Sequence, residues 1–491
     1  QLVAGVTWIP QQISLLHRTA SSLQGSNDGN GSFVTLDTWL DGSGLRSVER
    51  PSAADIESQG DRSGEGHDLG AVSATSNFHG STLDDFRRML EGYHVDDLTA
   101  LDPPRYRYMA YEKLPSTDSN CDRFARASEQ LPSDQGYWSG IDGTGAEYLF
   151  GTVWGQESIW QHQHPQDCRS ANIALVKSFP AGIGSMVDIM GHVMSVAFRA
   201  GHVVMWHPDD AAAWWGPWCG DIRTLDCYFE PLTNCTVENS GLDVSSAPVI
   251  SMQDPATVAI ALEGAKKTSP LAEMETMLEC SPIAEHVKCH WFKNQAAAYL
   301  VRPNTKVLTE LANRQERFLH FEPPSAADNA FRTVSVHIRW SEAKRNEADL
   351  VPPEQMWQGA AALQQVDPRL TRLFVSTESA EAIEQAKGLQ GWNATFLDVE
   401  RASGDRYDQV KHGEIRPDDE MLNSLLNLQL ALESDAFVCN RYSNWCGLID
   451  SLRLTAGRKA DRPLLDNGAP AKFCNGDYSS MLCGLCPKCP W

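Results

Sequence analysis

An alternating series of strand and helix patterns between residues 333 and 454 constrains the fold of this 491-residue chain more than any other feature. Short apolar runs separated by helical spacing are typical of consecutive βαβ units, which form a parallel sheet. We therefore predict an α/β, Rossmann-like domain here. The predicted elements are the strand Thr333–Arg339, helix Pro353–Val366, strand Arg372–Ser376, helix Ala380–Leu389, strand Asn393–Leu397, helix Asp418–Ser434, strand Ala436–Cys439 and helix Asn444–Leu454.

A second βαβ unit lies earlier in the chain. A β-like run at 171–178 is followed by a turn that contains Gly182 and Gly184, a helical pattern at 185–200 and a further strand at 202–206. Such a unit requires a parallel sheet with a right-handed crossover. Helical sequence follows from about 269 to 319. We predict two facing Rossmann-like domains, with ligands in the cleft at the carboxyl ends of the strands.

The flanking regions differ in composition from these two domains. Residues 1–77 are rich in Ser, Gly and Asp and are predicted to be a loop-rich stem, and residues 78–155 an accessory segment. The two Rossmann-like domains are assigned to 156–330 and 331–456, and residues 457–491 to a Cys-rich tail.

Composition excludes several classes of protein. The formal net charge of -23 argues against nucleic acid as a partner, and no apolar run is long enough to span a membrane. Thirteen cysteines, with Asn-x-Ser/Thr acceptors at Asn30, Asn234 and Asn393, favour the secretory pathway. Buried thiols and chance acceptor sequences are the alternative. We expect that any signal peptide or membrane anchor is already absent from this chain.

Three predicted strand-to-helix turns carry groups suited to binding phosphate. His337 and Arg339 end one strand, and the Arg guanidinium presents paired donors for a phosphate. Ser443 lies between a strand and a helix, where free backbone N–H groups favour an anion. The Gly182–Gly184 turn occupies the matching place in the first domain. The alternatives are a surface charge for Arg339 and a simple helix cap for Ser443.

Glu347 lies in a charged loop at 341–349 and is a candidate general base. The alternative is a solvated loop carboxylate. The sequence holds no Asp-x-Asp pair, the arrangement that often holds a divalent cation under a nucleotide diphosphate, so we predict no metal site.

Three further clusters allow two interpretations each. His162, His164 and Cys168 have the spacing of metal ligands, but a loop with a disulfide is favoured because a fourth ligand is missing. A terminal disulfide knot is favoured over zinc for Cys474, Cys483, Cys486 and Cys489. Trp214, Trp215 and Trp218 are expected either to stack on sugar rings or to belong to the core, with the core favoured.

The sequence Val336–Arg339, with Glu347 eight residues on and a proline at 352 or 353, resembles the His-Val-Arg-Arg region of the α1,6-fucosyltransferases and related GT-B fucosyltransferases. The resemblance covers roughly residues 156–454. Its other landmarks are Leu373–Glu378, Leu425–Asn427, Asp435–Cys439, Tyr442–Asn444, His164–Cys168, Gly182–Gly184 and Phe229–Thr236.

This resemblance implies a GT-B fold and an inverting, metal-independent fucosyltransferase. GDP-fucose would be the donor substrate and a glycan hydroxyl the acceptor, with no cofactor, in the Golgi lumen. His337 would contact guanine, Arg339 and Ser443 the pyrophosphate, and Glu347 would deprotonate the acceptor. The other donor-binding residues would be Gly182, Gly184, Lys344, Glu378, Asn427 and Asn444.

Two positions depart from the family pattern. Asn427 stands where the family has an Asp that binds guanine, and Trp340 replaces the second Arg of the motif. The alternatives are therefore a transferase that uses another nucleotide sugar, or a glycan- or nucleotide-binding GT-B protein without turnover.

Overall fold

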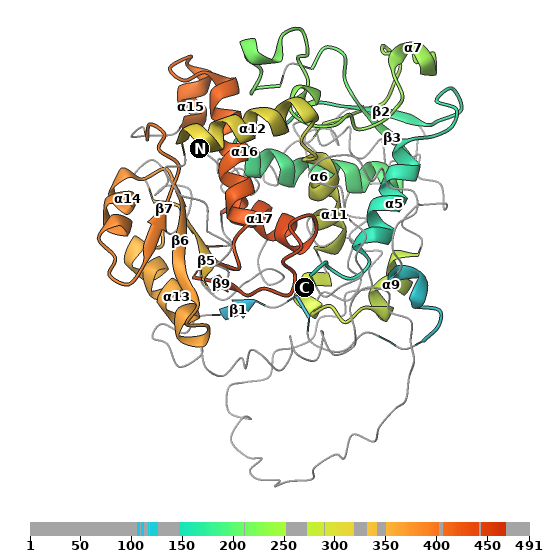
Figure 1. Ribbon diagram of the computed structural model, residues 1–491. Helices are drawn as coiled ribbons and strands as arrows, with labels where there is room; N and C mark the ends of the chain where they lie inside the picture. Colours follow the sequence, from blue (N-terminus) through green and yellow to red (C-terminus); the bar gives the residue numbers. More distant parts are fainter. Residues whose placement is uncertain are drawn as a thin grey trace, which may run out of the picture. The chain divides into compact units, whose positions relative to one another are not determined.

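A computed structural model (Figure 1) describes residues 106–125, 147–251, 273–318, 331–340, 350–401 and 406–467, apart from short gaps within these ranges. The described residues all belong to one compact unit of the chain. They form two separate β-sheets with helices between and around them.

The larger sheet has six strands in the order β1-β9-β8-β5-β6-β7. All neighbouring strands are parallel except β1, which pairs antiparallel with β9. Val336 in the central strand lies beside Val375 and Val438 of its two neighbours, and all three side chains are buried. The strands are β1 Tyr106–Tyr108, β5 Arg332–Ile338, β6 Leu370–Thr377, β7 Asn393–Thr395, β8 Ala436–Cys439 and β9 Leu464–Asp466.

Helices follow the strands of this sheet as the alternating pattern predicts. Their bounds are α13 Pro353–Val366, α14 Ala380–Lys387, α15 Arg406–Lys411, α16 Pro417–Leu432 and α17 Asn444–Leu454. Proline opens both α13 and α16, where its fixed φ suits the first helical turn and its missing N–H costs nothing. The predicted parallel α/β arrangement of this region is confirmed.

The smaller sheet has three parallel strands in the order β3-β2-β4. They are β2 Ile173–Val176, β3 Val203–Trp206 and β4 Val249–Ile250. Helix α6, Ile183–Arg199, connects β2 to β3, so the predicted βαβ unit is confirmed. The other helices of this part are α5 Thr152–Gln163, α7 Val237–Ser240, α9 Met274–Cys280, α10 Glu285–Lys288, α11 Trp291–Leu300 and α12 Thr305–Phe318, with short 3₁₀ turns at Asp122–Ala125, Pro217–Cys219 and Leu225–Cys227.

Helices α6, α11 and α17 pack against one another in the middle of the described chain (Figure 1). At the start of α6, a Cβ added to Gly184 would lie 2.8 Å from the backbone of Asn444, so only glycine fits this close approach. Beside it, the Asn444 amide donates a hydrogen bond of 2.9 Å to the Ser185 hydroxyl. The glycine turn predicted as a ligand site thus brings α6 against the first turn of α17.

Four disulfides link the described cysteines: Cys121–Cys280, Cys168–Cys235, Cys219–Cys227 and Cys439–Cys446. The predicted disulfide at Cys168 is confirmed, and such bonds persist in oxidising compartments. The acceptor residues Asn234 and Asn393 are exposed. Among the described residues, no helix combines the length and apolar character that a membrane span needs. The remaining predicted features, Asn30 and the terminal cysteines, lie outside the described residues.

Several elements differ from the prediction. Strand β9 lies in the stretch predicted as a tail, and β1 in the stretch predicted as an accessory segment; each has three residues, too few to show a period. Helices α5 and α15 and the two-residue β4 were missed. The helical stretch predicted for 269–319 is broken where Ser281 and Val301 leave the helical conformation.

Candidate functional site

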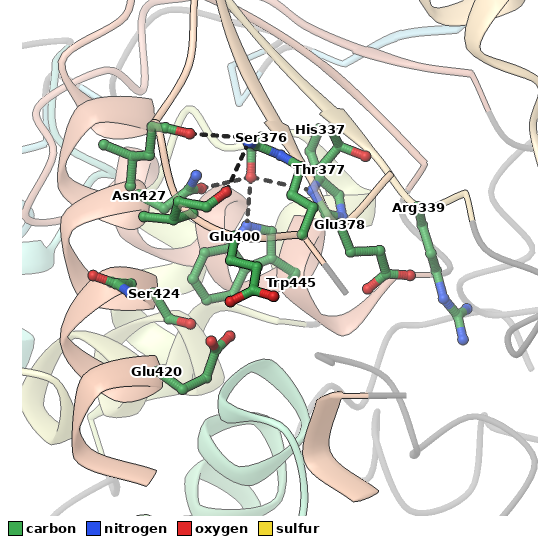
Figure 2. A pocket seen from close by; sticks show the side chains of 14 residues that line it. His337, Arg339, Ser376, Thr377, Glu378, Glu400, Glu420, Ser424, Asn427 and Trp445 are labelled. Atoms are coloured by element: carbon green, nitrogen blue, oxygen red, sulfur yellow. Dashed lines mark hydrogen bonds between the residues drawn. The ribbon is translucent and has the colours of Figure 1, made fainter. Parts of the chain in front are cut away.

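A pocket opens at the carboxyl ends of β5 and β6, where the sequence predicts ligand binding (Figure 2). It encloses about 680 Å³ of space, part of it open to solvent. Helices α16 and α17 and the segment after β7 close it. The lining residues are His337, Arg339, Ser376, Thr377, Glu378, Leu397, Val399, Glu400, Arg401, Glu420, Asn423, Ser424, Asn427 and Trp445.

The two residues of the strand-end motif lie in this pocket together. His337 and Arg339 are two positions apart at the end of β5, so their side chains leave the same face of the sheet. Both are buried, at 6% and 8% exposure. Ser376 lies beside His337 on the neighbouring strand, and Thr377 beside Ile338. The parallel pairing of β5 with β6 therefore places polar side chains of both strands at the same edge of the sheet.

A hydrogen-bond network joins four side chains at what we call the neutral end of the pocket: His337, Ser376, Asn427 and Trp445. The Ser376 Oγ lies 2.5 Å from Asn427 Oδ1, 3.3 Å from Trp445 Nε1 and 3.4 Å from His337 Nδ1. The other ring nitrogen of His337 lies 3.1 Å from the Ser443 hydroxyl. Burial lowers the pKa of His337 to about 4, opposed by the negative charge of Glu378, so the ring is neutral at pH 7.

This pKa predicts a pH dependence of stability. Because His337 takes up a proton near pH 6.5 in the unfolded chain and near pH 4 in the folded chain, the unfolded state binds more protons between these values. The contribution of the neutral His337 ring to the free energy of unfolding is therefore present above pH 6.5 and is lost as the pH falls toward 4. We expect His337→Asn to reduce the decline in unfolding free energy between pH 7 and pH 5 by about 1–2 kcal/mol. Denaturant titrations of both proteins measure this, and parallel pH profiles would contradict it.

Charged residues line other parts of the pocket. Figure 2 shows Arg339 and Glu378 extending to the end of the pocket away from Asn427, which we call the charged end. Arg401 follows β7 and donates hydrogen bonds to the backbone carbonyls of Leu397 and Val399. Glu400 and Glu420 supply further carboxylates. The lining of the pocket thus includes guanidinium groups, which suit an anion, and carboxylates, which accept hydrogen bonds from hydroxyl groups.

Ser443 takes a different place from the one predicted. It is the N-cap residue of α17, only 1% exposed, and its hydroxyl contacts His337 rather than lining the pocket. Asn444, which was also predicted to bind the donor, donates to Ser185 instead, and Gly184 packs against Asn444. The first turn of α17 therefore stands behind His337, and the Cys439–Cys446 disulfide closes the loop that leads into it.

Other predicted residues fall outside the pocket. The indole of Trp340, in place of the second motif Arg, donates 3.3 Å to Glu381 of α14. His162 Nε2 contacts the backbone carbonyl of His202, and His164 Nδ1 contacts that of Trp160. Cys168 is bonded to Cys235 in a disulfide. Lys344 and Glu347 lie outside the described residues.

The tryptophan cluster divides between core and surface. Trp214 is fully buried, which confirms the core interpretation for this residue. Trp218 stacks on Tyr228 beneath the Lys306 ammonium, and Trp215 is 37% exposed. The backbone N–H of Trp218 donates to Asp418 at the start of α16, so the cluster buttresses the helix that lines the pocket.

Sequence reasoning missed several lining residues. Ser376 ends a predicted strand and Thr377 follows it, so the rule that placed His337 would have identified both. On α16, the polar residues Glu420, Asn423, Ser424 and Asn427 recur at helical spacing, and the residues between them are apolar, which is a signal of one polar face. Nothing in the sequence around Trp445 predicts a place in the pocket, because that place depends on its contact with Ser376, which is distant in the sequence.

No family model matches the sequence, and no curated protein does. Several solved structures are similar. NodZ alpha-1,6-fucosyltransferase soaked with GDP-fucose is 13% identical, with a TM-score of 0.31 over 57% of this chain and 92% of its own. POFUT1 in its apo form is 11% identical, with a TM-score of 0.32 over 60% and 97%. A mutant of Arabidopsis thaliana FUT1 in complex with GDP is 11% identical, with a TM-score of 0.34 over 70% and 78%. These structural neighbours are fucosyltransferases.

Proposed function

We propose that the chain is an inverting, metal-independent fucosyltransferase of the GT-B type, which transfers L-fucose from GDP-fucose to a glycan hydroxyl. The observation that carries this proposal is the pocket at the carboxyl ends of β5 and β6, which brings the His337–Arg339 motif together with Asn427 and the start of α17. Ligands of parallel α/β sheets bind at this edge.

The two ends of the pocket suit two parts of a nucleotide sugar. The polar side chains of the neutral end suit the polar edges of a nucleobase, and Leu397 and Val399, which also line the pocket, suit its flat apolar faces. Arg339 at the charged end suits the diphosphate. The carboxylates of Glu378, Glu400 and Glu420 repel phosphate but accept hydrogen bonds from ribose or fucose hydroxyls. Gly184 and Asn444 serve this site indirectly, by holding α6 against α17, and Ser443 does so by contacting His337. Gly182 is the N-cap residue of α6.

The reaction is a single displacement in this proposal. Glu347 accepts the proton of the acceptor hydroxyl, the oxygen attacks the anomeric carbon of fucose, and the bond from that carbon to the GDP oxygen breaks with inversion. Arg339, and Lys344 from the same loop as Glu347, stabilise the charge on the departing diphosphate. Residues 331–456 would form the donor domain and residues 156–330 the acceptor side. The four disulfides support an oxidising compartment such as the Golgi lumen.

A donor panel tests the proposal. The protein is incubated with GDP-fucose, GDP-mannose, UDP-glucose and UDP-galactose, and release of the nucleoside diphosphate is measured with and without glycan acceptors. We expect release from GDP-fucose, accelerated by an acceptor. Binding of GDP-fucose without any release would indicate a nucleotide-binding protein instead.

A transferase for another nucleotide sugar is the second candidate. Two observations favour it: an amide at Asn427 in place of a carboxylate, and the indole of Trp340 turned to Glu381 in place of a second cation in the pocket. Release from a UDP-sugar but not from GDP-fucose in the same panel would establish this candidate.

Metal independence leads to a prediction of its own. The Arg339 and Lys344 side chains would stabilise the leaving diphosphate without a metal ion. We therefore expect an excess of EDTA to change the transfer rate by less than about twofold. Loss of transfer with EDTA, followed by recovery on addition of Mn²⁺ or Mg²⁺, would contradict this mechanism.

A further inference from the structure

The Ser376 hydroxyl determines how its neighbours present their polar atoms. It contacts Asn427, Trp445 and His337 at once (Figure 2). A hydroxyl has one proton to donate and two lone pairs that accept. The indole N–H of Trp445 can only donate, so it occupies one lone pair.

The distance to Asn427 decides where the Ser376 proton goes. The contact of 2.5 Å between Ser376 Oγ and Asn427 Oδ1 lies within the range of O–H···O bonds and below that of N–H···O bonds. Ser376 therefore donates to the amide oxygen. Its second lone pair accepts from His337, whose single proton in the neutral ring is then on Nδ1. His337 Nε2 accepts from the hydroxyl of Ser443.

This arrangement leaves one polar group of the network for a ligand. Both ring nitrogens of His337 are engaged, and the oxygen of Asn427 accepts from Ser376. Within the described part of the chain, no hydrogen bond is formed by Asn427 Nδ2, and this half-buried residue lines the pocket. The neutral end therefore offers N–H donors at Asn427.

We propose that Asn427 is a specificity-determining residue that binds the nucleobase as a hydrogen-bond donor, so that a purine turns its 6-oxo group, an acceptor, toward α16. This inference rests on the proposed function, in which a nucleoside diphosphate occupies the pocket. A carboxylate at this position would have the opposite preference, because it accepts from the ring N–H and the 2-amino group of guanine. Ser376 is the positioning residue that holds the amide in this orientation.

Titration calorimetry with GDP, IDP and ADP tests this inference on the full chain. GDP and IDP share the 6-oxo group and differ only in the 2-amino group, so we expect their dissociation constants to agree within about threefold. ADP carries an amino donor where the others carry the oxygen, and two donors cannot pair. We expect ADP to bind at least about tenfold more weakly.

The isosteric variant Asn427→Asp provides the decisive comparison. One carboxylate oxygen still accepts from Ser376, while the other faces the pocket and accepts from the 2-amino group of GDP. We expect this variant to prefer GDP over IDP by at least about tenfold. Gln429→Glu is the matched control, because it makes the same amide-to-carboxylate change on α16 at a residue outside the pocket lining. It should leave the ratio of GDP to IDP affinity unchanged.

The outcomes separate this inference from the function on which it rests. A parent protein that binds GDP at least tenfold more tightly than IDP, or an Asn427→Asp variant with an unchanged ratio, would overturn the donor role of Asn427 while nucleotide binding stands. If none of the three diphosphates binds, the proposed function fails and the inference fails with it.

Discussion

Glu347→Gln is expected to lower the rate of sugar transfer by about 10² to 10⁴ while GDP affinity changes little. In the proposed inverting transfer, the acceptor hydroxyl has a pKa far above neutrality, so its attack on the anomeric carbon would require a base on the face opposite the departing diphosphate. Glutamine keeps the shape and most of the hydrogen bonding of Glu347 but removes its basicity. Single-turnover transfer measures the chemical step, and calorimetry with GDP measures donor binding.

The control for this experiment comes from the same charged loop. Asp349→Asn removes a carboxylate two residues away and should leave transfer within a few-fold of the parent rate. If Asp349→Asn loses transfer while Glu347→Gln retains it, the base is Asp349. Equal, near-parental rates in both variants would refute a catalytic carboxylate in this loop.

Arg339→Ala is expected to weaken GDP binding by about 10- to 100-fold. Arg339 is buried at the end of β5 and lines the pocket, where one or two charge-assisted hydrogen bonds to the diphosphate would be lost. The effect should be smaller on guanosine, which lacks the phosphates. Calorimetry with GDP and guanosine therefore shows whether Arg339 binds the diphosphate or the nucleoside.

Arg332→Ala is the matched control for this variant. Arg332 begins the same strand at its opposite end and forms an ion pair with Asp367. Its loss should leave GDP affinity unchanged, since it lies a whole strand length from the pocket. A folded Arg339→Ala protein that binds GDP as tightly as Arg332→Ala would show that the diphosphate site has been misplaced.

The elements of the larger sheet could be predicted because their signals are local. Apolar runs and helical spacing occur within single segments, so β8 and the helices α13 and α17 agree with prediction residue for residue. The same local rule placed His337 and Arg339 at a strand end, and strand ends of a parallel sheet carry ligands. Short strands such as β9 have too few residues for any period, and β9 forms by pairing with β8 and β1.

The sequence alone therefore determined the parallel α/β fold and the edge at which the pocket forms, because both follow from periodicity along the chain. The tertiary structure alone decided which polar atoms face the ligand. Asn427 is 51 residues from Ser376 in the sequence, and Ser443 is 106 residues from His337. A hydrogen bond has one donor and one acceptor, so the orientation of an amide or an imidazole depends on partners that only folding brings within about 3 Å.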